Sequence, residues 1–181
     1  MAESRNEKSS VPASPSGPAY TWTVADFLSG EFPAGLRVLL VDEDPVSLLI
    51  LERLLQTSLY QVTKCDRAEE ALSRLREKKD GFDIILSDVH MADMDGIKFL
   101  DCIVREMDIP VIMLSADERN DVLMKAVIHG ACAFFVKPVR PRLVQCIWEH
   151  VLRKKVKEEK GLKKSTITTL PNHGSNILQG D

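Results

Sequence analysis

The stretch LRVLLVDEDP (residues 36–45) carries the pattern that determines the fold. Five of its first six residues are apolar, and it ends in three acids and a proline. A short apolar run bounded by turn residues is typical of a strand that is buried on both faces. Four comparable runs follow, at residues 60–65, 82–87, 111–114 and 131–136. We therefore predict five strands, with the core of the domain beginning at Leu36.

Segments with the apolar spacing of helices separate these runs. They cover residues 45–56, 68–77, 96–106, 118–129 and 141 to about 155. Regular alternation of strand and helix is typical of an α/β domain whose parallel sheet is covered on both faces. Because crossovers between parallel strands are right-handed, five such units predict a flavodoxin-like (βα)5 doubly wound sheet with strand order 2-1-3-4-5.

The length and composition predict one folded domain with two tails. The chain has 181 residues, of which 44% are hydrophobic and 28% charged, and these values exclude a wholly disordered or collagen-like protein. We expect a mostly disordered linker at residues 1–34, with one short helix at 23–29 that is capped by Thr23 and anchored by Trp22 and Phe27. The domain itself is expected at residues 35–155. A polar, disordered tail is expected at 156–181.

Several function classes are disfavoured by the same composition. No apolar run approaches the about 18 residues that cross a bilayer, and the N-terminus lacks a secretory signal, so we expect no membrane association. A net charge of −3 argues against direct nucleic-acid binding. The basic segment RKKVKEEKGLKK (residues 153–164) is interpreted as a solvated helix extension, with nuclear import as the alternative. The expected location is therefore the nucleus, or otherwise the cytoplasm.

Polar residues stand directly after four of the predicted strands. Asp42 and Glu43 follow the first strand, Asp88 the third, Ser115 the fourth and Lys137 the fifth. In an open α/β sheet, ligands bind outside the carboxyl ends of the strands, near the point where the strand order reverses. The predicted order makes these four strand ends neighbours, so the sequence predicts one polar crevice there.

The acids of this crevice need a positive partner. Two carboxylates about 4 Å apart repel each other by about 4 kcal/mol at an effective dielectric constant of 20. Lys137 offsets one charge, and carboxylate and carbonyl oxygens are the ligands that Mg²⁺ prefers. With both cations present, Asp88 is a candidate nucleophile that takes a phosphoryl group as an acyl phosphate. Ser115 is a candidate hydrogen-bond partner of a phosphoryl oxygen.

Four motifs at these positions resemble the receiver domain of two-component response regulators. They are VLLVDED (38–44), LSDVHMADMDG (86–96), IPVIMLSA (109–116) and FFVKP (134–138). The resemblance covers about residues 35–155. It implies that Asp88 is the phosphoacceptor and that Ser115 and Lys137 act beside it.

The resemblance also implies a ligand set, a switch and partners. Asp42, Glu43, Asp88 and the backbone carbonyl of His90 would bind Mg²⁺. Phe134 would be the aromatic switch residue of a face formed by residues 118–129, 131–136 and 141–155, and the peptide before Pro138 would be cis. A histidine phosphotransfer protein or histidine kinase would supply the phosphoryl group, and the receiver could dimerise. Such a domain is a phosphoacceptor with self-dephosphorylation rather than a conventional enzyme.

The amino-acid sequences of three segments are similar to those of plant type-B response regulators of cytokinin signalling. This similarity rests on FPAGLRVLLVDEDP (32–45), DVHMADMDG (88–96) and IWEHVLRKK (147–155). Two residues depart from the family pattern, because Ala92 replaces a proline and Glu43 replaces an aspartate. Type-B regulators continue into a Myb-like DNA-binding domain. We expect this chain to lack it, since the sequence stops soon after its basic segment.

Two other functions stay open on the sequence. DEDPV (42–46) fits the opening motif of haloacid-dehalogenase phosphatases, in which Asp42 would be the nucleophile. That class needs a later acidic motif, and no Asp stands between Lys137 and Asp181. The second alternative is a pseudo-receiver that has kept the fold and lost phosphoryl transfer. Two capping roles are also expected, since Asp44 precedes Pro45 as a helix N-cap and SADE (115–118) fits a capping box.

Overall fold

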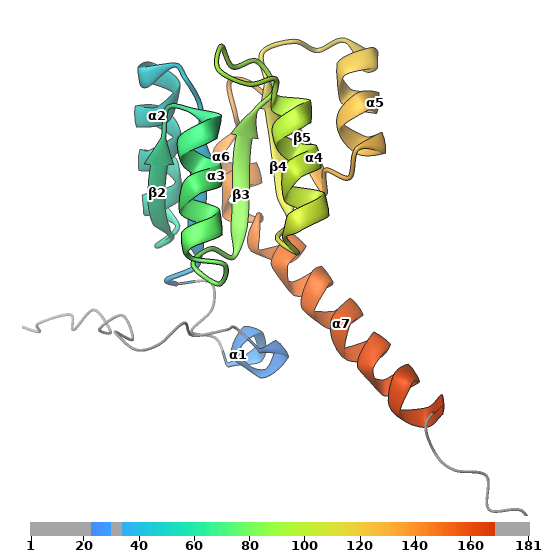
Figure 1. The fold of residues 1–181 in the computed structure, drawn as a ribbon. Helices are drawn as coiled ribbons and strands as arrows, with labels where there is room; N and C mark the ends of the chain where they lie inside the picture. The colour runs from blue at the N-terminus through green and yellow to red at the C-terminus, as the bar shows by residue number, and fades with distance from the viewer. Residues whose placement is uncertain (1–22, 30–33, 169–181) are drawn as a thin grey trace, which may run out of the picture.

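The computed structural model describes residues 23–29 and 34–168. Of the tails expected at 1–34 and 156–181, residues 1–22, 30–33 and 169–181 lie outside the described residues. The domain is built on a five-stranded parallel sheet of order β2-β1-β3-β4-β5, which confirms the predicted flavodoxin-like topology (Figure 1). The strands are β1 (Arg37–Val41), β2 (Gln61–Cys65), β3 (Ile84–Asp88), β4 (Val111–Ser115) and β5 (Ala133–Val136).

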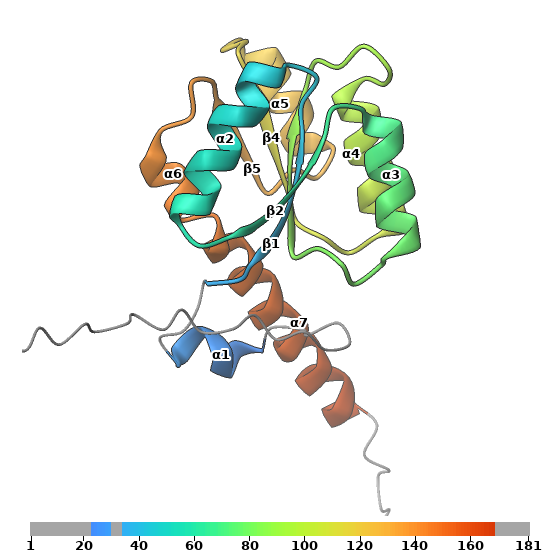
Figure 2. The ribbon, with the colours of Figure 1, turned by 90° about the vertical axis from the view of Figure 1, so that its left-hand side faces the viewer.

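Helices cover both faces of this sheet. They are α1 (Val24–Leu28), α2 (Pro45–Thr57), α3 (Ala68–Glu77), α4 (Gly96–Glu106), α5 (Asn120–Ile128), α6 (Pro141–Gln145) and α7 (Trp148–Thr168). Seen along the sheet, α2 and α6 lie on one side and α3 and α4 on the other (Figure 2). None of these helices is long and apolar enough to span a bilayer.

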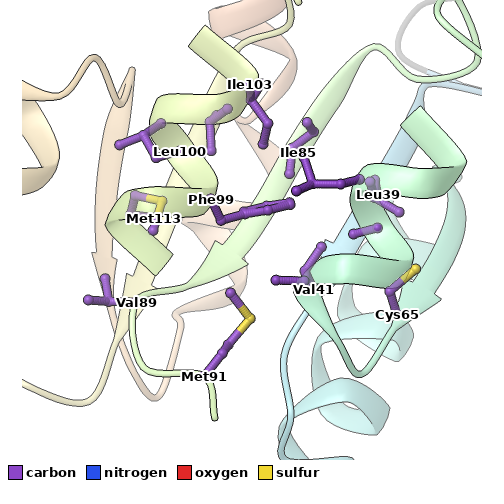
Figure 3. Packing of buried hydrophobic residues seen from close by; sticks show 14 of the residues in the cluster. Leu39, Val41, Cys65, Ile85, Val89, Met91, Phe99, Leu100, Ile103 and Met113 are labelled. Atoms are coloured by element: carbon purple, nitrogen blue, oxygen red, sulfur yellow. The ribbon is translucent and has the colours of Figure 1, made fainter. Parts of the chain in front are cut away.

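Two buried clusters hold the layers together. Alternate residues of a strand point to opposite faces, so Leu39 and Ile85 face α3, α4 and α5, whereas Val38 and Leu86 face α2, α6 and α7. Phe99 of α4 reaches between the strands and α3 in the first cluster (Figure 3). This packing orients the strands so that their carboxyl ends meet at one edge.

Two helix starts test the predicted caps. The Asp44 carboxylate accepts the backbone N–H groups of Val46 and Ser47 at 3.1 and 3.3 Å, which confirms the N-cap of α2. The capping box expected at residues 115–118 is wrong, because α5 begins only at Asn120. Instead, Ser115 Oγ accepts the N–H of Asp117 at 3.0 Å and turns the chain before the helix.

The C-terminal helix differs from its prediction in two ways. A single helix at 141–155 was expected, but the chain forms α6 and then α7, which continues to Thr168. The expected disordered tail therefore does not begin at residue 156. Lys154 and Lys155 both lie within 3.5 Å of Glu158, and such pairs three or four residues apart stabilise a solvated helix. The basic segment forms the predicted helix extension.

The short N-terminal helix forms as predicted and packs on α7. Thr23 and Asp26 make a reciprocal capping box at its start. Helix α1 contacts α7, and Phe27 packs against the buried cluster that Trp148 also contacts. The anchor proposed at Trp22 lies outside the described residues.

Candidate functional site

The strand ends bring the predicted polar residues to one edge of the sheet. Parallel pairing sets Val41 beside Ser87 and Asp88 beside Leu114. It also sets Ser115 beside Val136, and the backbone N–H of Lys137 bonds to the Ser115 carbonyl at 2.8 Å. Residues far apart in the sequence therefore converge as the strand order requires.

The Lys137 ammonium is the centre of this site. Its Nζ lies 2.6 Å from Asp42 Oδ2 and 3.3 Å from Asp88 Oδ2. The side chain of Asp42 is fully buried, and that of Lys137 is only 18% exposed. Little water screens these charges, so the two carboxylates depend on the ammonium between them.

The Asp42 carboxylate is held by further donors. Its Oδ2 accepts the Ser47 hydroxyl at 2.5 Å, and its Oδ1 accepts the backbone N–H of Asp44 at 3.0 Å. Both donors belong to the start of α2, where the helix dipole favours a negative charge. Ser47 was not among the residues predicted for the site. Its place in the first turn of a helix that begins right after the acidic pair was the available signal.

Asp88 is the less compensated of the two buried acids. Burial raises the pKa of its carboxyl, the Lys137 ammonium opposes this rise, and the Asp42 charge adds to it. The backbone N–H of His90 also bonds to the carboxylate and lowers the pKa, but the net direction is upward. The free-energy cost of this buried negative charge falls when a cation binds beside the carboxylate or when the carboxylate forms a covalent bond.

Glu43 points away from this pair. Its side chain is exposed, and Oε2 accepts the backbone N–H of Ala92 at 2.7 Å. The two residues border a shallow hollow of about 280 Å³, which is lined by Glu43, Val89, His90, Met91, Ala92 and Asp95. The hollow gives solvent access to the loop that follows Asp88.

That loop, residues 89–95, is attached to its surroundings at several points. Met91 is buried in the cluster beneath α4. Asp93 Oδ2 accepts the N–H of Glu69 at 3.0 Å and thereby caps α3 from outside, since Arg67 makes no side-chain cap there. At Gly96, a Cβ atom would lie 2.4 Å from the Asp88 carbonyl oxygen. The roles of Asp93 and Gly96 were not predicted from the sequence.

Ser115 and Phe134 lie behind the charged centre. Ser115 is fully buried at the end of β4. Phe134 is half-buried on β5, beside Met113 in the sheet register, and packs against the cluster under α4 and α5. The Lys137–Pro138 peptide is cis, as predicted.

The donor set fits a divalent cation by charge, although its members are dispersed. No three Asp, Glu, His or Cys side chains form a metal-binding group within residues 23–29 and 34–168. The reason is that Lys137 lies between Asp42 and Asp88 and that Glu43 is bonded to Ala92. Asp42 and Asp88 beside one ammonium still leave a net negative charge, Glu43 lies on the adjoining loop, and hard oxygen donors suit Mg²⁺.

Comparison with protein families decides the class of the domain. A family model described as the response regulator receiver domain matches residues 38–147. The chain belongs to this family. Receiver domains generally bind Mg²⁺ at their acidic pocket and generally are not conventional enzymes.

Plant response regulators and bacterial receivers are among the relatives. The two-component response regulator ARR2 of Arabidopsis thaliana is 59% identical over 72% of this chain and 20% of its own length. ORR21 of Oryza sativa is 48% identical over 81% of this chain and 22% of its own. The chain thus spans about a fifth of these relatives. The predicted similarity to plant response regulators is confirmed.

Solved structures agree with the fold. The chemotaxis response regulator CheY4 of Vibrio cholerae superposes with a TM-score of 0.58 and 26% identity, over 65% of this chain and 99% of that one. A CheY-like receiver from Methanospirillum hungatei gives 0.60 and 25%, over 69% and 99%.

The surroundings of Asp42 argue against the phosphatase alternative. Both carboxylate oxygens of Asp42 are engaged, by Asp44, Ser47 and Lys137. A fully buried carboxylate with these partners is poorly placed to attack a substrate.

Proposed function

We propose that this domain accepts a phosphoryl group on Asp88 from a phosphohistidine protein. The observation that carries the proposal is the position of the Lys137 ammonium, which lies within 3.3 Å of Asp88 and 2.6 Å of Asp42 at the ligand-binding edge of the sheet. This arrangement gives one nucleophilic carboxylate, one fixed cation and one acid that keeps the cation in place.

The transfer step is an in-line displacement at phosphorus. An Asp88 oxygen forms a bond to phosphorus while the bond from phosphorus to the donor imidazole nitrogen breaks, and its electron pair returns to the imidazole. The product is an acyl phosphate. Lys137 pairs with an equatorial phosphoryl oxygen, which stabilises the charge that is spread over these oxygens in the transition state. Attack of water on the same phosphorus later restores the carboxylate.

Asp42, Glu43, Asp88 and the His90 carbonyl would hold Mg²⁺ at this edge. When bound, the ion would neutralise part of the phosphoryl charge. The chain itself provides two further functions. The buried Asp42 orients Lys137, and Asp88 makes the covalent bond.

Phosphorylation is proposed to alter the face formed by α5, β5, α6 and the start of α7. The group adds about −1.5 to −2 charges, and the Ser115 hydroxyl at the end of β4 can bond to one of its oxygens. This draws the β4–α5 loop inward and gives Phe134 a second packing position. A local charge thereby selects between two packings of a surface that contacts partners.

The outer face of α2 is the proposed docking surface for the donor. Val46, Leu49 and Ile50 are 61%, 46% and 54% exposed, although they are large apolar side chains. They lie on the first turns of the helix that begins beside the site. Such a patch fits a histidine phosphotransfer protein or a histidine kinase, which must bring its phosphohistidine to the crevice.

The relatives support a biological setting for this chemistry. We place the chain in a plant His-Asp phosphorelay, with cytokinin signalling as its setting and the nucleus as its location. Transcription regulation and receiver dimerisation belong to the same proposal. The basic extension of α7 is compatible with nuclear import.

Mapping the modified residue tests the proposed function. The protein is incubated with Mg²⁺ and either a phosphorylated histidine phosphotransfer protein or acetyl phosphate, and the labelled peptide is identified by mass spectrometry. We expect the label on Asp88. A label on Asp42 would restore the phosphatase alternative, and a folded protein that takes up no label would be a pseudo-receiver.

Replacing Lys137 by Ala should separate phosphorylation from switching. The variant loses the cation that links Asp88 to the end of β5, so the acyl phosphate analogue formed with BeF₃⁻ should no longer shift the NMR signals of Phe134 and α5. Lys64→Ala is the matched control, because Lys64 is also ion-paired, to Glu52, but on the outer strand β2. Signal changes equal to those of the unmodified protein would contradict the role of Lys137.

A further inference from the structure

Glu43 and Ala92 join two loops at the edge of the site. Glu43 Oε2 accepts the backbone N–H of Ala92 at 2.7 Å. The bond joins the β1–α2 loop to the loop after Asp88, across 49 residues of sequence. It is a charge-assisted hydrogen bond of ordinary length.

This bond needs a backbone N–H at position 92 and a long acidic side chain at position 43. A proline at position 92 has no N–H to donate. An aspartate at position 43 is one methylene shorter, so its carboxylate would fall short of the same amide.

The amide side of the bond is the fixed side. Met91 is buried beneath α4 and Asp93 caps α3, so the residues on both sides of Ala92 are held by other elements. Glu43 is an exposed side chain with rotatable bonds. When the bond opens, Glu43 is therefore the partner that moves.

We propose that the Ala92 amide is a latch that holds Glu43 away from the divalent-ion site and lowers the affinity of this receiver for Mg²⁺. The inference rests on the proposed function, because Glu43 is one of the residues that would hold the ion. With the latch closed, the described side chains form no group of three metal ligands. Ion binding through Glu43 must first break the bond to Ala92, and this cost is subtracted from the binding free energy.

The latch predicts that Ala92→Pro tightens Mg²⁺ binding about three- to tenfold, the range expected when a solvent-exposed hydrogen bond no longer competes. Ala92→Ser keeps the N–H and should bind within about twofold of the unmodified protein. Binding is measured by isothermal titration calorimetry with MgCl₂, and thermal unfolding shows that each variant is folded.

Glu43→Asp provides a second route that leaves the loop backbone unchanged. It should raise the Mg²⁺ affinity like Ala92→Pro, and adding Ala92→Pro to it should change the affinity less than about twofold, since the bond is already absent. In the metal-free protein, the Ala92 amide should exchange its hydrogen about tenfold faster in Glu43→Asp than in the unmodified chain.

The outcomes separate this inference from the proposed function. If Mg²⁺ binds and Asp88 is phosphorylated but Ala92→Pro and Glu43→Asp leave the affinity unchanged, the latch is wrong and the proposed function stands. An Ala92 amide that exchanges equally fast in both proteins also overturns the latch. If the unmodified protein binds no Mg²⁺, the metal site of the proposed function fails and the latch with it.

Discussion

The Asp88→Asn variant is expected to fold normally and to accept phosphoryl groups at least about 100-fold more slowly than the unmodified protein. A carboxamide keeps the size of the side chain but lacks the anionic oxygen that attacks phosphorus. Asp42 does not replace it, because Lys137, Ser47 and the Asp44 amide occupy its oxygens. Transfer of radiolabelled phosphate from a phosphohistidine protein measures the loss.

The same variant should be more stable than the unmodified protein at neutral pH. Burial, against the opposing effect of Lys137, raises the pKa of the Asp88 carboxyl in the folded state. The folded protein therefore binds this proton more tightly than the unfolded chain, and stability falls as the pH rises from the ordinary aspartate value through the raised one. Above that range the ionised carboxylate is a cost, which the neutral amide removes, so we expect a gain of about 1 kcal/mol.

The pH dependence provides the control on this explanation. Below the ordinary pKa of aspartate, the Asp88 carboxyl of the unmodified protein is protonated in both the folded and the unfolded state. The difference in stability between the unmodified protein and Asp88→Asn should then disappear. Asp108→Asn is the matched variant, because Asp108 has an 87% exposed side chain at the other end of the sheet. It should transfer phosphate normally. A stability gain of Asp88→Asn that does not change with pH would contradict the burial argument.

The convergence of the site could be predicted because it follows from periodicity and topology. Each strand ends where an apolar run ends, and the rule for parallel sheets places the ends of β1, β3, β4 and β5 together. The placement of Asp42, Asp88 and Lys137 at one edge could therefore be predicted without knowing the geometry of the loops. The Lys137 ammonium lies within 3.3 Å of both carboxylates, in agreement with that placement.

The contacts that depend on the path of a loop could not be predicted in this way. Ser47 reaches Asp42 only because α2 starts at a particular angle to β1, and Glu43 meets Ala92 only because the loop after Asp88 turns back toward β1. The helix start predicted at residue 118 was wrong for a related reason, since α5 begins at Asn120. Ser115 and Asp117 have the chemistry of caps, but they stabilise the preceding turn instead of the helix.

A single methyl group added at Gly96 should strongly destabilise the fold. Its virtual Cβ lies 2.4 Å from the Asp88 carbonyl oxygen and 2.5 Å from the Val89 carbonyl oxygen. Both are backbone atoms, so no side-chain rotation relieves the clash. The first turn of α4 must shift away from the loop, and we expect Gly96→Ala to lower the free energy of unfolding by about 3 kcal/mol.

The comparison with Gly161→Ala distinguishes this clash from a general effect of glycine. Gly161 lies within α7, where a Cβ would meet nothing within 4 Å, so alanine should stabilise the helix by about 0.5–1 kcal/mol. Chemical denaturation measures both variants. Because the clash at Gly96 involves the carbonyl of Asp88 itself, Gly96→Ala should also slow phosphoryl transfer in the fraction that remains folded. Equal small effects of the two substitutions would mean that α4 can move without cost, and the loop after Asp88 would then not be held by the close contact at Gly96.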